Sequence, residues 1–394
     1  MRVNTKAQES VSGEVSGIML AFADRTGLSS SRHPPRRYLW TDAHAVCNFL
    51  SLYRRTGSEE YRQLAVMLID QVHNDLGKHR NDDARSGWLS GLGDKEGSQH
   101  PTAGGLRIGK QLPERGPDDV FDERLEWDRD GQYYHYLTKW MHALCRAGTV
   151  CNEPVYIRWA MELAAAAHAG FAVRSPPDGR MRFVWKMSID LTTPLVPSSS
   201  LHDSLDGYLT YIEIAHCASR LAASGPRTGL GKEILDAAGM IRGRRWYSSD
   251  PLGIGGLLFD ACRTLQLLAA GQIGHPALAT TLLQDASESL LDYRRQANLG
   301  QAAKFRLAFR ELGLSTGLHA LSKMRAVLSN RSDPLAGALR DDLAALGDYE
   351  PMAGIITGFW RDSVNQQADS WREHEDINSV MLATSLLPGE FLEV

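Results

Sequence analysis

Residues 43–53 read AHAVCNFLSLY, and residues 61–76 read YRQLAVMLIDQVHNDL. Apolar side chains cover nearly every side of the first stretch, whereas in the second they recur on one helical face with charges opposite. A helix that is apolar all round is buried, and a helix with one apolar stripe lies at the surface. The two stretches, joined by a turn at residues 55–58, therefore predict an inner helix followed by an outer helix.

The same couplet recurs along the chain. Predicted inner helices begin near residues 42, 130, 203, 251, 304 and 377, and the last can pair with an amphipathic segment at residues 11–22. One helical hairpin cannot bury its apolar face alone, so the hairpins must stack on one another. Stacking of this kind predicts an all-α fold, the (α/α)6 toroid of helical hairpins. An open α-solenoid is the alternative, but the irregular spacing of the couplets favours a closed ring.

Two long insertions interrupt the helical pattern, at residues 78–127 and 172–201. Long loops in a compact domain are usually functional. In the second insertion, residues 181–190 alternate in polarity and follow a turn at residues 176–179, which predicts a small β-hairpin. No Pro- or Gly-rich linker divides the chain, so we expect a single toroid domain over residues 1–394, with both insertions at its rim.

The composition restricts the classes of partner. The 394 residues are 43% hydrophobic and 23% charged, as in a globular protein, and the net charge of −4 argues against nucleic acid. No apolar run approaches the length of a membrane span, so no membrane partner is expected. Five scattered cysteines and an N-terminus without an apolar signal segment indicate buried thiols in the cytoplasm. Without a phosphate-binding loop or a Cys/His cluster, we expect no cofactor and no metal.

The predicted inner helices all run in the same direction, so their N-termini meet at one rim of the ring. These N-termini carry carboxylates, which include Asp42, Asp128, Asp130, Asp203 and Asp376. Paired carboxylates perform general acid and base catalysis on glycosidic bonds. Asp is also a preferred N-cap residue that interacts well with the helix dipole, so a structural role is the alternative. Asp42 is included among the catalytic candidates.

The densest group of functional side chains is the segment EWDRDGQYYHY at residues 126–136. Aromatic rings stack on sugar faces, while carboxylates and a guanidinium bind hydroxyl groups. We therefore expect Asp128 and Asp130 to be catalytic. The residues of this segment that are expected to bind substrate are Trp127, Arg129, Tyr133 and Tyr134. A helix-start ion pair surrounded by core aromatics is the alternative.

A second candidate segment, SLHDSLDGY at residues 200–208, places His202, Asp203 and Asp206 within about one helical turn. We expect His202 and Asp203 to take part in catalysis, and Asp206 and Asp376 in substrate binding. These acids could position a water molecule or bind hydroxyl groups, and they could equally form a helix cap.

The predicted hairpin strand adds two further substrate-binding candidates. Trp185 offers an aromatic ring, and Lys186 offers a positive charge for an anionic substrate group. A strand face that is simply solvated is the alternative.

Residues 40–57 and 127–133 resemble segments of six-hairpin (α/α)6 glycosidases. The sequence WDRDGQY at residues 127–133 is similar to the Trp-x-Arg-x-Asn/Gly-x-Trp inner-helix segment of unsaturated glucuronyl and rhamnogalacturonyl hydrolases. The resemblance implies a toroid in which an inner-helix Asp is the general acid. N-acylglucosamine and cellobiose epimerases share this toroid and use a pair of histidines. Among the rim histidines of this chain, His202 and His374 could take that part.

The sequence thus predicts a glycoside hydrolase-like, carbohydrate-active enzyme that uses paired rim carboxylates on a sugar that can carry an acidic group. Its expected partner is a small carbohydrate. The alternatives are a sugar epimerase or isomerase on the same toroid, and a non-enzymatic scaffold that binds a ligand, because a fold does not imply a function.

Overall fold

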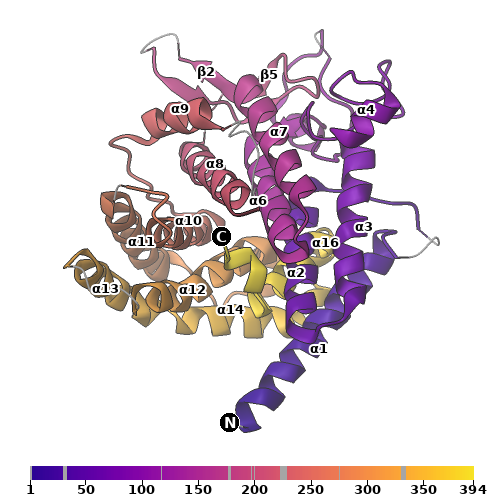
Figure 1. Cartoon of the computed structure of the whole chain (residues 1–394). Coiled ribbons are helices and arrows are strands. Elements are labelled where there is room, and N and C mark those ends of the chain that lie inside the picture. The colour runs from indigo at the N-terminus through magenta and orange to yellow at the C-terminus, as the bar shows by residue number, and fades with distance from the viewer. Residues whose placement is uncertain are drawn as a thin grey trace. The chain divides into compact units, whose positions relative to one another are not determined.

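The computed structural model describes residues 2–29, 33–116, 118–175, 179–196, 198, 200–221, 229–274, 276–329 and 334–394. The chain forms two compact units (Figure 1). The first unit comprises residues 1–22, 54–57 and 243–394, and the second comprises residues 23–53 and 58–242. The expectation of a single domain over residues 1–394 stays a prediction.

The second unit alternates fully buried and one-faced helices. Its helices are α2 (Leu39–Thr56), α3 (Glu59–Leu76), α4 (Asp94–Gln99), α5 (Glu123–Asp128), α6 (Tyr134–Cys151), α7 (Pro154–Phe171), α8 (Leu201–Leu221) and α9 (Gly231–Ile241). In α2 every side chain over residues 39–52 is buried, whereas α3 buries a single stripe that contains Leu64, Leu68 and Val72. Helix α6 packs against α7 and α8, and α8 packs against α9. The predicted order of inner and outer helices is confirmed in this unit.

The first unit contains the other helices. They are α1 (Arg2–Arg25), α10 (Pro251–Ala269), α11 (Pro276–Gln296), α12 (Ala308–Ser329), α13 (Pro334–Leu346), α14 (Pro351–Arg361), α15 (Asp369–Arg372) and α16 (Glu375–Leu386). Helices α10 and α12 form the most extensive contact, and α12 also packs against α14 and α16. By length and composition α10 could cross a membrane, but 67% of its apolar window is buried, as in the core helix of a folded domain.

All predicted inner helices exist, and each begins within four residues of its predicted start. Helix α14 was missed, because Pro351, Gly354 and Gly358 read as a loop in a short segment. The five cysteines are free thiols, and all but Cys151 are buried. The expected cytoplasmic location stays a prediction.

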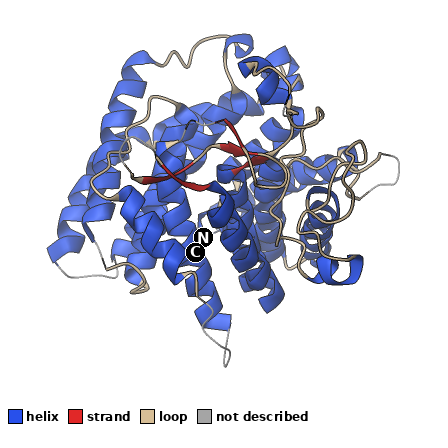
Figure 2. Cartoon of the chain, turned by 90° about the horizontal axis from the view of Figure 1, so that it is seen from above, coloured by secondary structure: helices blue, strands red, loops and turns tan. Residues whose placement is uncertain are grey.

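The strands, red in Figure 2, belong to the second unit. Strands β2 (Ala172–Arg174) and β3 (Met181–Phe183) pair antiparallel, which confirms the predicted β-hairpin; residues 176–178 of its turn lie outside the described residues. Strands β1 (Gln132–Tyr133), β4 (Lys186–Met187) and β5 (Pro194–Val196) form a second sheet in the order β1-β4-β5. Sequence periodicity missed this sheet because two or three residues are too few to show an alternation.

A buried ion pair fastens the first insertion to the start of α6. The Asp130 carboxylate is fully buried and accepts hydrogen bonds from Arg107 Nη1 at 2.6 Å and from the Gly109 amide at 3.0 Å. Arg107 also donates from Nε to the Lys78 carbonyl at 2.7 Å. One carboxylate and one guanidinium thus hold both ends of the insertion that begins at residue 78.

A second buried ion pair fastens strand β4 to helix α5. All three Nζ protons of Lys186 are used: they go to Glu126 Oε1 at 2.8 Å, to the Glu126 carbonyl at 2.7 Å and to the Arg129 carbonyl at 2.9 Å. The other carboxylate oxygen of Glu126 accepts from Arg115 Nε at 3.1 Å. A buried charge is tolerated only when it is paired in this way.

In the first unit, α10 and α12 approach closely through glycines. A Cβ atom on Gly317 would lie 2.5 Å from the Gly255 carbonyl oxygen, and one on Gly255 would overlap the Gly313 carbonyl. Gly256, the next residue of α10, has open space at the corresponding position. The close contact of these two inner helices therefore requires glycine at specific positions.

Replacing Asp130 by Asn should destabilise the protein by about 3 kcal/mol, because the Arg107 guanidinium would lose its fully buried counter-charge and keep only its ion pair with the part-exposed Asp75. Asp128→Asn is the matched control: this carboxylate is exposed, so we expect a change within about 0.5 kcal/mol. Urea unfolding of both variants measures the difference. Equal stability of the two variants would contradict the structural role of Asp130.

Gly255→Ala should cost about 1–3 kcal/mol, because the added methyl group forces α10 and α12 apart. Gly256→Ala tests the same chemical change where there is room, and it should be neutral or stabilise the helix by up to about 1 kcal/mol. Thermal unfolding of the two variants gives the comparison. A Gly255→Ala variant as stable as its neighbour would show that the helices do not pack this closely.

Candidate functional site

Within the second unit, the starts of α2 and α6 and the two insertions bring aromatic side chains together. We call this group the aromatic cluster; its members are Tyr38, Trp127, Tyr133, His135, Tyr136 and Trp185. The Trp185 ring stacks on Tyr133 with 5.5 Å between centroids and meets Trp127 edge-on at 4.7 Å. Trp127 remains 46% exposed, so the cluster presents ring surface to solvent.

A hydrogen bond between two tyrosine hydroxyl groups joins the start of α2 to α6 within the cluster. The Tyr38 and Tyr136 hydroxyl groups lie 2.6 Å apart, and burial raises the pKa of Tyr38 to about 12. The Lys110 ammonium lies 5.4 Å from the centroid of the Tyr38 ring and makes no hydrogen bond to the described residues. Burial lowers the pKa of Lys110, while the charges of Asp128 and Asp130 oppose this shift. An amine held over a ring in this way can bind an oxygen acceptor or an anion.

The start of α8 contributes two carboxyl groups with different environments. Asp206 accepts hydrogen bonds from Thr138 Oγ1 at 2.5 Å and from Lys139 Nζ at 2.7 Å. Asp203, one turn earlier, is 3% exposed, and its Oδ2 has no hydrogen-bond partner among the described residues. Burial, reinforced by the negative charge of Asp206, raises the pKa of Asp203 to about 8. Asp203 is therefore protonated at neutral pH.

The acidic group and the aromatic cluster are neighbours. The charges of Lys139 and Asp206 both act on the imidazole of His135, a member of the cluster. His135 Nδ1 in turn accepts a hydrogen bond from the Trp185 indole at 3.2 Å. The predicted meeting of inner-helix N-termini is thus confirmed for α2, α6 and α8 of this unit.

Among the predicted site residues, Asp203, Trp127, Tyr133 and Trp185 lie in or beside this region. Asp128, the last residue of α5, is exposed and makes no hydrogen bond or ion pair with the described residues. Its charge still acts on both Lys110 and Tyr133. Asp128 is consequently a carboxylate that a ligand can reach.

Other candidates are engaged in the interior. Tyr134 is fully buried: its ring stacks on Phe183 with 4.1 Å between centroids, and its hydroxyl donates to Tyr211 at 2.8 Å. The expectation that Tyr134 offers a stacking face is corrected, because both sides of its ring belong to the core. Lys186, with all its protons used, cannot meet a substrate anion without breaking its ion pair. The same reasoning applies to Asp130, whose contacts are those of a structural residue.

The remaining predicted site residues are Arg129, Asp42, His202 and Asp376. Arg129 Nη1 donates to Asp119 Oδ2 of the first insertion at 2.9 Å. Asp42 is buried and accepts from the Tyr38 amide at 2.9 Å, as the alternative role in a helix start requires. His202 is half-buried in the first turn of α8, and Asp376 lies in the first turn of α16, in the first unit.

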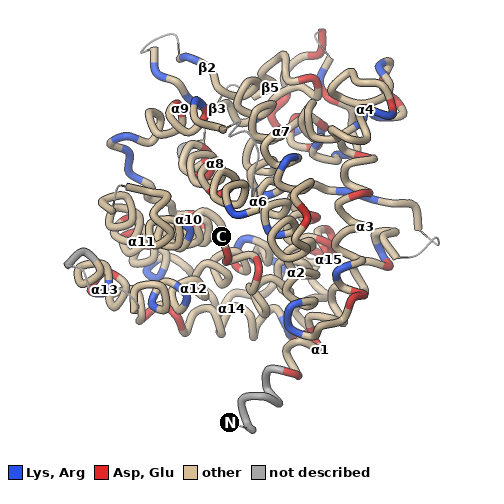
Figure 3. Tube along the Cα trace, in the orientation of Figure 1, with Lys and Arg blue, Asp and Glu red and all other residues tan. Residues whose placement is uncertain are grey.

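Sequence reasoning missed His135, Lys139, Lys110, Tyr38 and Tyr136. Two polar stripes could have revealed part of the site. On α6 the residues that recur at helical spacing are His135, Lys139, His142 and Arg146; on α8 they are Asp203, Asp206, Thr210 and Glu213. Polar residues on the buried face of an inner helix need partners, so such stripes indicate facing polar groups. Figure 3 marks the charged positions along both helices.

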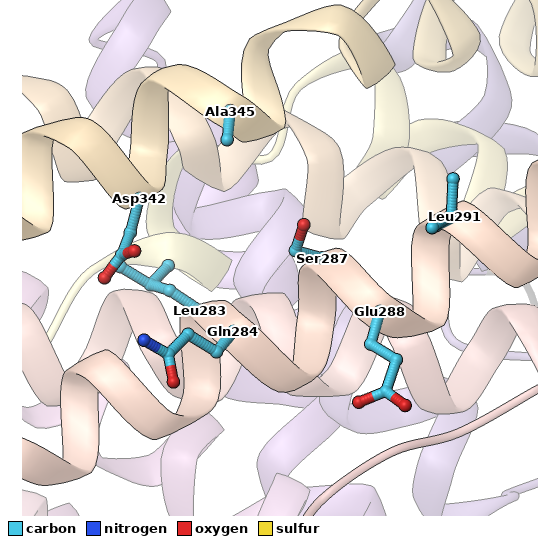
Figure 4. Close-up of a pocket in the computed structure, with 7 residues that line it drawn as sticks. All are labelled: Leu283, Gln284, Ser287, Glu288, Leu291, Asp342 and Ala345. Atoms are coloured by element: carbon cyan, nitrogen blue, oxygen red, sulfur yellow. The ribbon is translucent and has the colours of Figure 1, made fainter.

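Neither a metal site nor a second sugar-binding surface is present in the described residues. In the described ranges, no group of three or more His, Cys, Asp or Glu side chains could hold a metal ion. A groove of about 330 Å³ lies between α11 and α13 of the first unit, with Leu283, Glu288 and Asp342 among its lining residues (Figure 4). It contains a mixture of leucine and carboxylate side chains without aromatic rings, so it does not resemble a sugar-binding surface.

The sequence matches no protein-family model and no curated protein. Solved structures do match. The GH76 α-1,6-mannanase of a Salegentibacter species is 12% identical, with a TM-score of 0.53, and the match covers 97% of this chain and 100% of that one. A GH76 α-mannanase of Bacteroides thetaiotaomicron is 10% identical, with a TM-score of 0.54 and 97% of each chain covered.

An inactive variant of the Salegentibacter enzyme, in complex with α-1,6-mannotriose, matches at 13% identity with a TM-score of 0.51, over 97% of this chain and 100% of that one. These matches support the six-hairpin, glycosidase-like fold, and they do not confirm the particular resemblance to unsaturated glucuronyl and rhamnogalacturonyl hydrolases. At such low identity the likeness concerns the fold alone. The chain has the all-α (α/α)6 toroid fold, as its helical couplets predict.

Proposed function

We propose that this chain is a carbohydrate-active enzyme that hydrolyses a glycosidic bond, with Asp203 as the general acid. One observation carries the proposal. Asp203 is a buried carboxyl group whose Oδ2 has no hydrogen-bond partner among the described residues and whose pKa burial raises to about 8, and its neighbour Asp206 acts on His135 of the partly exposed aromatic cluster. A group with a pKa near the working pH can both hold and release a proton, as a general acid must.

The chemistry requires a second carboxylate. In glycoside hydrolysis the acid gives its proton to the leaving glycosidic oxygen, while a carboxylate activates the attacking water or attacks the anomeric carbon itself. Asp128 is our candidate, because it is exposed and has no ion-pair partner among the described residues. Asp206 is held by Thr138 and Lys139, so its charge serves to raise the pKa of Asp203.

The aromatic cluster supports a carbohydrate as the class of substrate. Trp127 and Trp185 can stack on sugar rings, because Trp127 is exposed and Trp185 is half-buried, whereas Tyr133 is buried between Trp185 and His135 and supports them. Because Lys186 is engaged in the interior and Arg129 is paired with Asp119, an acidic sugar would depend on Lys110. The mannotriose bound by the Salegentibacter enzyme makes α-1,6-linked mannose oligosaccharides the first ligands to test.

Replacing Asp203 by Asn should lower kcat for glycoside hydrolysis by about 10²–10⁴-fold and leave oligosaccharide binding nearly unchanged, because the amide cannot donate an acidic proton. Asp70→Asn is the matched control, since burial also raises the pKa of Asp70 but this residue belongs to the outer helix α3. Product analysis and calorimetric binding measure the two effects. Full activity of the Asp203 variant would rule out this acid.

The pH dependence gives an independent test. Activity should fall as pH rises above about 8, because Asp203 then loses its proton. Since the folded pKa lies above the ordinary value, the folded state binds more protons between about pH 4 and 8, and stability should decline as pH rises across that window. Asp203→Asn should abolish both trends. An activity profile that stays flat to pH 10 would contradict the assignment.

The same product analysis separates the alternatives. Hydrolysis consumes water and shortens the oligosaccharide, whereas an epimerase returns a sugar of unchanged mass. Conversion without loss of mass would favour the epimerase or isomerase. Binding without any conversion would favour a non-enzymatic scaffold.

A further inference from the structure

His135 is held in one orientation by the aromatic cluster. Its imidazole stacks on Tyr133 with 5.4 Å between centroids and meets the edge of Tyr136 at 4.7 Å. The indole N–H of Trp185 donates to its Nδ1 at 3.2 Å. An indole nitrogen is a donor only, so Nδ1 must carry no proton. A neutral His135 ring therefore has its proton on Nε2.

The ring is neutral at physiological pH. Burial lowers the pKa of His135 to about 4; the positive charge of Lys139 adds to this shift, and the negative charge of Asp206 opposes it. His135 is thus a single tautomer that can donate from Nε2 but cannot accept a hydrogen bond there.

No described residue accepts the Nε2 proton. The polar contacts of His135 with the described residues involve Nδ1 or its backbone, and Nε2 is not sealed from solvent. The side chain is half-buried, so this N–H remains accessible. Aromatic rings thus hold the His135 imidazole in place, and its Nε2–H can donate a hydrogen bond to a ligand.

We propose that His135 is a specificity-determining donor to an oxygen of the sugar bound at the aromatic cluster, and that Trp185 is the positioning residue that fixes its tautomer. This inference rests on the proposed function as a carbohydrate-active enzyme. A hydroxyl, ring or glycosidic oxygen can accept from Nε2. A protonated amino group cannot, so an amino sugar is disfavoured wherever its ammonium group would meet His135.

The test is nitrogen NMR of the histidine side chains during titration with α-1,6-mannotriose. The free protein should show His135 as the Nε2–H tautomer, and the sugar should shift the Nε2 resonance. His168 is the internal control: its Nε2 lies 3.2 Å from Asp236 Oδ2, and its ring contacts Phe183 and Tyr211 instead of the cluster. Its resonances should not move.

Variants of His135 and Trp185 distinguish the effect of the Nε2 hydrogen bond from that of the aromatic ring. His135→Leu should weaken mannotriose binding roughly tenfold, as expected for one lost hydrogen bond in a partly buried site, and His135→Gln, which keeps an N–H, should lose less. Trp185→Phe keeps an aromatic face and removes the indole donor. In that variant His135 should become a mixture of tautomers, with weaker binding.

Binding that leaves the Nε2 resonance of His135 unchanged, or a Trp185→Phe variant with the same tautomer, would overturn the inference and leave the proposed function standing. If neither mannotriose nor another oligosaccharide binds to the wild-type protein, both proposals fail together. The tautomer of the free wild-type protein is measured in either case.

Discussion

The candidate site depends on two buried ion pairs that fasten the insertions to the helices beneath them. Asp130 binds Arg107 and the backbone of the first insertion, and Lys186 binds Glu126. Both members of the second pair adjoin a tryptophan of the aromatic cluster: Glu126 precedes Trp127, and Lys186 follows Trp185. Long insertions have little core of their own, so their side chains stay in place only where such contacts order the backbone. Asp130 and Lys186, two charged residues that the sequence predicts in the site, thus have the contacts of structural residues.

These supports leave a different set of polar groups available to a ligand. Burial next to Asp206 raises the pKa of Asp203, and Asp206 accepts hydrogen bonds from Thr138 and Lys139. The different surroundings of Asp203 and Asp206 give these two carboxyl groups different chemical properties, although they lie one helical turn apart. Such a separation is the general means by which one site can hold an acid and a carboxylate at the same pH.

The sequence predicted some of the site and missed some, for physical reasons. The sequence pointed to Asp203, Trp127 and Trp185 because an acid at a helix start and aromatic residues in an insertion stand out locally; their roles in a site stay a prediction. Tyr134 was misjudged, because the local sequence does not show that both Tyr133 and Tyr134 are buried, and only packing decides how far a side chain at a helix start is covered. The second sheet and helix α14 were missed because their segments are short or rich in breakers.

What the sequence determined by itself is the helical architecture: its apolar periodicity sets which helices are inner and where they begin, because burial of apolar surface is a property of the residues on each helix. What only the tertiary structure decided is the role of each polar residue. Lys186 and Lys110 are lysines of the two insertions. The ammonium group of Lys186 donates three hydrogen bonds in the interior, whereas that of Lys110 lies over the Tyr38 ring. The ion-pair partner of a charged side chain is set by distance in space, and it often comes from a residue far away in the chain, so only the folded structure identifies it.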